Sequence, residues 1–160
     1  MKGFYLMNYL ITFLISMIPL VELRGAVPYA IATGIPMWQA LTIGVIGNML
    51  PVPIIFFFAR KVLEWGADKP VIGGFFTWCL KKGHSGGQKL TKAAGERGLF
   101  IALLIFVGIP LPGTGAWTGT LAASILDWNF KRSVVAVMLG VILAGLIMGT
   151  LTSIGLNILG

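Results

Sequence analysis

The sequence has very little of what enzymes and metalloproteins depend on. Of its 160 residues only 11% are charged, and it contains one cysteine, Cys79, and one histidine, His84. A lone cysteine cannot form a disulfide within the chain, and a lone histidine does not build a zinc or haem site. A His-Asp-Ser set and paired carboxylates within the apolar segments are missing as well. We therefore expect no metal, no cofactor and no enzymatic activity.

What the chain does contain is apolar. Hydrophobic residues make up 57% of it and its mean hydropathy is +0.92, which is typical of integral membrane proteins. A helix needs roughly 20 apolar residues to cross a bilayer core that is about 30 Å thick. This length allows a single all-α membrane domain over residues 1–160, which we expect to be multi-pass in the plasma (inner) membrane.

The formal net charge of +7 predicts membrane lipids and not nucleic acid as a partner. The basic residues flank apolar segments, whereas nucleic-acid-binding proteins carry basic stripes with interleaved aromatic residues. Eight of the twelve basic residues lie in 60–98. The positive-inside rule places this linker in the cytoplasm. Within it, 71–80 is too short to span and predicts a short amphipathic helix at the interface, followed by a flexible loop over 83–87.

Two long uncharged runs predict complete transmembrane helices. The first covers 37–59 and the second covers 133–159, each with basic residues next to one end. Pro51 and Pro53 fall in the second half of the first run. Because proline removes a backbone donor and crowds the preceding turn, we expect a kink there.

The segment 99–126 has a different pattern, in which two apolar arms of about eleven residues flank the sequence PLPGTG. Each arm would rise about 16 Å as a helix, half of the bilayer core. Two prolines and two glycines in succession cannot continue a helix. The segment therefore predicts a re-entrant hairpin with its tip near the midplane and both ends on the cytoplasmic side, in agreement with Lys131 and Arg132 just after it.

The sequence also contains a weak internal repeat. IPLVELRGAVPYAIATGIPMW in the first half aligns, with one gap, to IPLPGTGAWTGTLAASILDW in the second. The aligned pairs are Pro19 with Pro110, Gly25 with Gly115, Ala26 with Ala116, and Trp38 with Trp128. Each stretch precedes a long apolar run, so we interpret 1–59 and 99–160 as two inverted repeats, each a re-entrant hairpin followed by a transmembrane helix. The first hairpin would cover 8–35 and open to the outside.

A competing topology treats 4–21 as a complete span with a cytoplasmic N-terminus. Lys2 alone does not decide between the two arrangements. The same segment resembles a secretory signal in its hydropathy. It has no small-residue cleavage site after it, and we expect it to remain in the mature protein.

Glu22 and Arg24 lie at the predicted tip of the first hairpin, between long apolar stretches. Ionisable groups at that depth are costly and usually functional. In a turn both side chains can point into one cavity, where the carboxyl could exchange a proton as solute passes. The alternative is a structural ion pair, or an interfacial pair if the first segment is a simple span.

The second predicted tip offers residues 113–115 immediately before a half-helix that starts near Ala116. Thr114 is the expected N-cap of that half-helix. By the repeat, Gly25 should precede the matching half-helix, with Pro28 in its first turn. Two helix N-termini would then converge beside the arginine and favour an anion such as a phosphate or carboxylate. The alternative is that these residues only make tight turns.

Two further residues complete the predicted site. Asn48 lies three residues before Pro51, where it could line a path or bond a carbonyl freed by the proline kink. Trp117 is the aromatic residue expected to face a cavity. The predicted transport site comprises Glu22, Arg24, Gly25, Pro28, Asn48, Pro110, Pro112, Gly113, Thr114, Gly115 and Trp117.

Three motifs, PLVELRGAVP, GNMLPVP and IPLPGTGAWTG, resemble the putative small multidrug export protein family over nearly the whole chain. That family is in turn similar to the DedA superfamily of re-entrant-hairpin membrane proteins, which includes candidates for lipid-carrier phosphate transport and relatives with lipid scramblase activity. The positions that the resemblance implies are Glu22, Arg24, Gly25 and Pro28 in the first tip and Pro110, Pro112, Gly113, Thr114, Gly115 and Trp117 in the second.

Three functions are consistent with these observations. The leading hypothesis is a secondary transporter that exports small molecules of the multidrug type, with proton coupling through Glu22, because no P-loop for ATP is present. The second is a translocase or scramblase of a phosphate-bearing lipid. The third is a non-transporting membrane scaffold that associates through Gly145 and Gly149, which are spaced as a close helix-packing face. In each case a homo-oligomer, specifically a dimer, is expected for so small a chain.

Overall fold

The computed structural model describes residues 2–70 and 72–159, and over these residues every regular element is a helix. The helices are α1 Lys2–Met17, α2 Glu22–Ala32, α3 Met37–Met49, α4 Pro51–Ala67, α5 Gly73–Gly108, α6 Ala116–Ile125 and α7 Phe130–Leu159. The all-α fold class is therefore confirmed for the described part of the chain.

Two stretches of helix are long and apolar enough to cross a bilayer, as predicted. Met37–Ala67 joins α3 and α4 over 31 residues, and Phe130–Ile158 covers 29 residues of α7. The first runs past the predicted end at residue 59, because Arg60 forms an ion pair with Glu64 one turn later, 2.9 Å apart. The regular helix is interrupted only at Leu50, immediately before Pro51, and Leu50 itself keeps helical dihedral angles of φ −62° and ψ −43°, so the expected kink stays a prediction.

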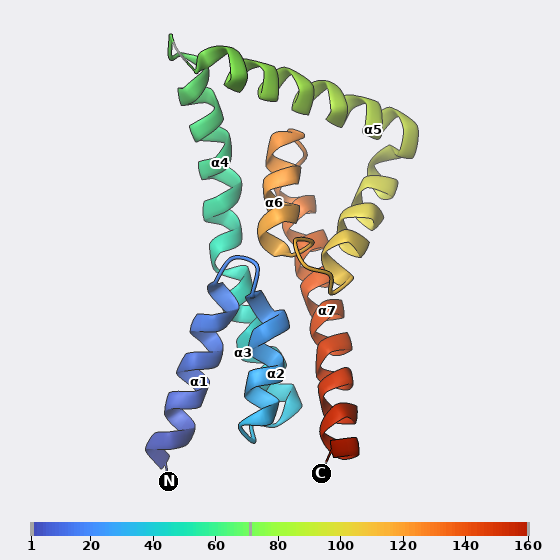
Figure 1. Ribbon diagram of the computed structural model, residues 1–160. Helices are drawn as coiled ribbons and strands as arrows, with labels where there is room; N and C mark the ends of the chain where they lie inside the picture. Colours follow the sequence, from blue (N-terminus) through green and yellow to red (C-terminus); the bar gives the residue numbers. More distant parts are fainter. Residues whose placement is uncertain (1, 71, 160) are drawn as a thin grey trace.

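The helices form two groups that face each other across the middle of the molecule (Figure 1). Helices α1, α2 and α3 pack against one another at the lower end, and α4, α5 and α6 pack against one another at the upper end. Helix α7 runs along both groups and contacts α2, α3, α5 and α6. The turn between α1 and α2 and the turn between α5 and α6 reach mid-height from opposite ends, which brings them together.

Both predicted breaks in the helical pattern are present. The first lies between Met17 and Glu22, where Leu20 has a positive φ of 70°. The second lies between Gly108 and Ala116, where Gly113 has a φ of 84°. Positive φ reverses the chain direction in few residues, so each break makes a tight turn between two antiparallel helices.

The central linker differs from its prediction. Val71 lies outside the described residues, and 73–80 form the first turns of α5, whose first helical arm continues through the predicted loop 83–87 as far as Gly95. Glycine is unfavourable in a helix, but Gly83 and Gly87 share a face and lie directly against the backbone carbonyls of the C-terminal end of α6. A side chain at either position would overlap those carbonyls. The helix turns sharply at Gly95, whose φ is 66°.

This packing gives a prediction for two neighbouring glycines of α5. We expect Gly87→Ala to destabilise the protein by about 2 kcal/mol, because its methyl group would overlap the Leu126 carbonyl and force α5 away from α6. The matched control is Gly86→Ala, which meets only a Leu126 methyl group at 3.5 Å and should stabilise the helix by up to about 1 kcal/mol. Thermal unfolding in a neutral detergent measures both. Equal shifts for the two variants would contradict the proposed packing.

Gly145 and Gly149 form a packing face within the chain. A Cβ at Gly145 would lie 2.8 Å from a Leu41 methyl group, and one at Gly149 would lie 2.7 Å from the Met37 methyl group. The face that the sequence offered for association with another copy is therefore covered by α3 of the same chain. Larger residues at these positions would disturb the fold itself.

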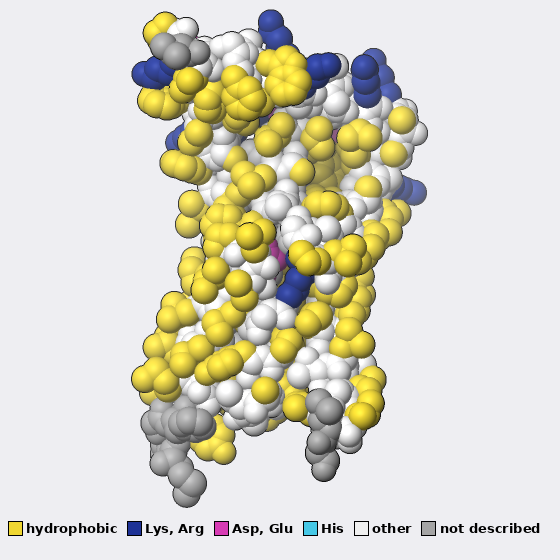
Figure 2. All heavy atoms as spheres, viewed as in Figure 1, with side chains coloured by type: hydrophobic (Ala, Val, Ile, Leu, Met, Phe, Trp, Pro, Cys, Tyr) yellow, Lys and Arg dark blue, Asp and Glu magenta, His cyan; other side chains and the backbone are white. Residues whose placement is uncertain are grey.

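The core and the surface agree with a lipid environment. The largest buried cluster joins α2, α4, α5, α6 and α7 through Leu23, Val27, Val52, Val107, Ala116, Val137, Val141 and Ala144. Large apolar side chains are also exposed along the outside, among them Leu6, Ile54 and Leu151. Figure 2 shows apolar side chains over most of the visible face, whereas basic side chains gather at the upper end, where α4 ends and α5 crosses the molecule.

Candidate functional site at the junction of the two turns

Glu22 connects the first turn to the second hairpin. It is the first residue of α2 and has a positive φ of 52°, a conformation that non-glycine residues adopt at the expense of backbone strain. Its side chain is only 3% exposed. The two carboxylate oxygens accept hydrogen bonds from the backbone N–H groups of Ala116 and Trp117, each at 3.1 Å. The carboxylate thus caps the N-terminus of α6, far along the chain.

The N-terminus of α6 is built to receive this carboxylate. Gly115 is the N-cap residue and provides no side-chain hydrogen bond of its own. A Cβ at Gly115 would overlap the Glu22 carboxylate, so only glycine lets the two backbones approach this closely. Free N–H groups and the helix dipole favour an anion at such a terminus. The anion that the sequence predicted here is, in this structure, the carboxylate of Glu22.

Arg24 binds the opposite element of the second hairpin. Its Nη2 atom donates hydrogen bonds to the carbonyl oxygens of Val107 at 3.0 Å and Ile109 at 3.2 Å. These carbonyls belong to the C-terminal end of α5, where the helix dipole favours a cation. Nη2 also lies 3.1 Å from the Thr114 hydroxyl oxygen. Only 11% of the Arg24 side chain is exposed.

The two charges therefore complement both helix ends at the second turn. Glu22 places its negative charge at the N-terminus of α6, and Arg24 places its positive charge at the C-terminus of α5. Between the two side chains, Nη1 of Arg24 lies 4.0 Å from an oxygen of Glu22. Each charge is stabilised more directly by backbone dipoles than by the other charge. This arrangement fastens the tip of the first hairpin to the tip of the second.

Thr114 does not cap α6 as predicted. Its hydroxyl oxygen lies 2.8 Å from the carbonyl oxygen of Ile109 and 2.9 Å from that of Leu111, within its own turn. The cap comes from Glu22 instead, because a charged acceptor is stronger than a hydroxyl and the long-range contact places it at the helix axis. Thr114 closes the turn and supports Arg24.

Gly25 and Pro28 lie inside α2, not before it and not in its first turn. The helix begins at Glu22, so Gly25 is its fourth residue and Pro28 its seventh. The prediction was wrong because the positive φ at Glu22 turns the chain directly into the helix. Pro28 has no N–H to donate to the carbonyl of Arg24 one turn earlier, so the usual helical hydrogen bond between these two residues is missing.

A cavity of about 190 Å³ opens at the junction. Of the predicted residues, Glu22, Arg24, Gly113, Gly115 and Trp117 line it, together with Pro19, Leu20, Thr118 and Leu121. Two buried donors of this group, Nε of Arg24 and Nε1 of Trp117, have no hydrogen-bond partner among the described residues. Buried donors are almost always paired, so an acceptor from a solute or water is the natural occupant of this space.

The remaining predicted residues lie elsewhere. Pro110 and Pro112 shape the second turn without being among the described residues that line the cavity. Asn48 is buried in α3, outside that lining, and its Oδ1 has no partner among the described residues. The structure therefore brings together the charged pair, the glycines and Trp117, and leaves Asn48 apart.

Sequence reasoning missed the backbone carbonyls of Val107 and Ile109 and the apolar wall formed by Leu20 and Leu121. Backbone acceptors carry no residue-type signal, and leucines in an apolar sequence do not stand out. The spacing of Leu121 four residues after Trp117 was the one available clue, because it places both on the same face of α6.

Residues 22–147 match the family described as putative small multi-drug export protein, a span that begins at Glu22, directly after the first turn, and includes the second turn. No curated protein and no solved structure matches the chain. The family match and the two long apolar helices identify an integral membrane protein. The family name indicates a role in export without naming a substrate. The chain belongs to the putative small multi-drug export protein family.

Proposed function

We propose that this protein is a secondary transporter that exports small molecules across the plasma membrane, with the junction of the two turns as its coupling site. The observation that carries the proposal is the buried Glu22 carboxylate, which holds two oppositely directed hairpins together in the middle of an apolar molecule. Ionisable groups at such positions in membrane proteins mark solute and proton pathways.

The lengths of the hairpin helices support a re-entrant arrangement. Helix α1 has 16 residues and α6 has 10, which correspond to rises of about 24 Å and about 15 Å. Both are shorter than the roughly 30 Å of a bilayer core. With Met37–Ala67 and α7 spanning the membrane, the two turns would lie near its midplane and enter from opposite faces, as expected for inverted repeats.

Protonation of Glu22 would release the contact between the hairpins. A neutral carboxyl accepts hydrogen bonds from Ala116 and Trp117 less strongly than a carboxylate and no longer complements the dipole of α6. Arg24 is the charged side chain that faces Glu22 in this cavity; the described residues of α5 and α6 contribute none. Proton uptake by Glu22 on one side of the membrane would thus favour separation of the two hairpin tips. Loss of that proton would favour the closed contact between them.

The present cavity corresponds to a closed state. Drug-sized ligands occupy pockets of roughly 300–1,000 Å³, whereas the junction offers about 190 Å³. Separation of the tips would widen it between Leu20 and Leu121 and expose the unpartnered donors of Arg24 and Trp117. A solute with an apolar body and a hydrogen-bond acceptor would fit this lining.

The proposal is tested by flux in proteoliposomes with and without a pH gradient, using a cationic and an anionic fluorescent dye. We expect gradient-driven flux of at least one dye through the native protein. In the Glu22→Gln variant the gradient-driven dye flux should fall to the level of protein-free liposomes, because glutamine fills the same space but takes up no proton. Glu64→Gln, which removes an exposed carboxylate of α4, should transport normally.

Two results would reject proton-coupled export. One is flux that does not respond to the gradient in the native protein. The other is an unchanged response in Glu22→Gln when size-exclusion profiles show that the variant is folded.

A second candidate function has one specific observation in its favour. The N-terminus of α6 already binds an oxyanion, and a lipid phosphate could take the same N–H groups of Ala116 and Trp117 after displacing Glu22. This would correspond to the lipid-transport candidates of the DedA superfamily, to which the family that the motifs resemble is in turn similar. It predicts flipping of a fluorescent anionic phospholipid without any pH gradient, a result that would replace the exporter proposal.

A further inference from the structure

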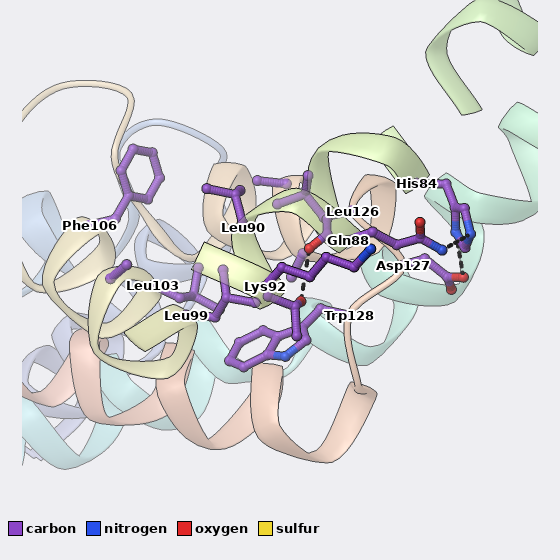
Figure 3. Close-up of a pocket in the computed structure, with 15 residues that line it drawn as sticks. His84, Gln88, Leu90, Lys92, Leu99, Leu103, Phe106, Leu126, Asp127 and Trp128 are labelled. Atoms are coloured by element: carbon purple, nitrogen blue, oxygen red, sulfur yellow. Dashed lines mark hydrogen bonds and ion pairs between the residues drawn. The ribbon is translucent and has the colours of Figure 1, made fainter. Parts of the chain in front are cut away.

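A second and larger cavity lies beneath the bend of α5, between both arms of that helix and the end of α6 (Figure 3). Its volume is about 620 Å³. The sharp turn at Gly95 creates it, because the two arms of α5 diverge from that point and α6 closes only one side. A cavity of this size matches one drug-sized molecule.

The lining changes from apolar to polar along the cavity (Figure 3). One end is formed by Leu99, Leu103 and Phe106 on the second arm of α5. The other end holds His84 and Gln88 from the first arm, next to Asp127. Lys92 and Trp128 lie between these two ends. A ligand that satisfies both ends must itself be amphiphilic.

The charges in the polar part favour an acidic group. Asp127 is already engaged, since its carboxylate pairs with Arg60 and lies 3.4 Å from Nδ1 of His84. Lys92 is an exposed residue of the lining and has no ion pair among the described residues, and the indole Nε1 of Trp128 is buried without a hydrogen-bond partner there. A cation and a neutral donor are thus free beside the apolar wall, while the one carboxylate of the lining is occupied. An anionic head group would complement them.

We infer that this cavity binds a single-chain amphiphile with an acidic head group. The alkyl chain lies along Leu99, Leu103 and Phe106, and the head group accepts hydrogen bonds from Lys92 and Trp128. The volume is suited to one chain. The inference is independent of the proposed function, because the cavity is separate from the junction and binding requires neither Glu22 nor a proton gradient.

The head-group preference tests the inference on the native protein. The full chain in nanodiscs of zwitterionic lipid is titrated with a dansyl-labelled undecanoic acid at alkaline pH, and empty nanodiscs give the background. The probe is then displaced by dodecanoate, dodecanol or dodecyltrimethylammonium, which share one chain length. We expect dodecanoate to displace it at about tenfold lower concentration than the other two, the effect of one charge-assisted hydrogen bond. Equal potency, or stronger displacement by the ammonium compound, would overturn the inference.

Paired variants locate the site. Lys92→Gln should weaken probe binding about tenfold. Lys89→Gln, which removes the same charge from an exposed residue of α5 outside the cavity, should leave it unchanged. Ala102→Trp should abolish binding by filling the apolar end. An equal loss in both lysine variants would show only general electrostatic attraction, and unchanged binding in Ala102→Trp would place the probe elsewhere. Either outcome contradicts the assigned site.

Discussion

Glu22→Ala is expected to lower the free energy of unfolding by about 3 kcal/mol or more, one of the two largest effects predicted for this chain. The substitution removes the acceptor of the Ala116 and Trp117 N–H groups and leaves them buried without partners. It also leaves the Arg24 guanidinium without its nearby counter-charge. Thermal unfolding in a neutral detergent, or steric trapping in bicelles, measures the loss.

Two companion variants show whether this loss comes from the junction. Glu64→Ala removes an exposed carboxylate that is paired with Arg60, and should change stability by less than about 0.5 kcal/mol. Arg24→Ala and the double variant complete a double-mutant cycle. Because both side chains fasten the same pair of turns, the double loss should be clearly smaller than the sum of the single losses. Strict additivity would mean that the two charges act independently.

Gly115→Ala is expected to be comparably severe, at about 3 kcal/mol, for a purely steric reason. The backbone of Gly115 has a φ of −82°, which alanine adopts without strain. The added methyl group would instead occupy the space of the Glu22 carboxylate and push it off the N-terminus of α6. We therefore expect both the loss of stability and the transport defect of Glu22→Ala to be reproduced by a change that leaves Glu22 in place.

The neighbouring Gly113 provides the control for this prediction. Its φ is 84°, and a Cβ there would meet no atom within 4 Å. Gly113→Ala should therefore cost only the 1–2 kcal/mol of stability, roughly, of a left-handed non-glycine residue. If Gly113→Ala were the more damaging of the two, the shape of the turn and not the Glu22 contact would control the junction.

The features that depend on local pattern could be read from the sequence. Uninterrupted apolar runs longer than a bilayer predicted Met37–Ala67 and α7, and the proline and glycine clusters predicted both turns. Glu22 and Arg24 stood out because ionisable residues are rare in such surroundings. Whether they formed a structural pair or a functional site was left open. Their geometry shows that they bind helix ends, and the transport role rests on the experiments above.

The features that depend on distant contacts could not be read in this way. Glycines in 83–87 predicted a loop by their low helix propensity, yet α5 is continuous there because the carbonyls at the end of α6 require residues without side chains. Thr114 had the residue type of an N-cap, but Glu22, 94 positions away from Ala116, supplies the cap. In both cases a tertiary contact outweighs the local preference.

The interruption at Leu50 has a mechanical consequence for the whole molecule. Pro51 and Pro53 donate no backbone hydrogen bonds, so the carbonyls one turn earlier, those of Gly47 and Met49, receive none from them. The α3–α4 connection therefore lacks these two helical hydrogen bonds at the level where the two tips meet. A change in the angle between α3 and α4 would therefore act directly on the contact between the two tips.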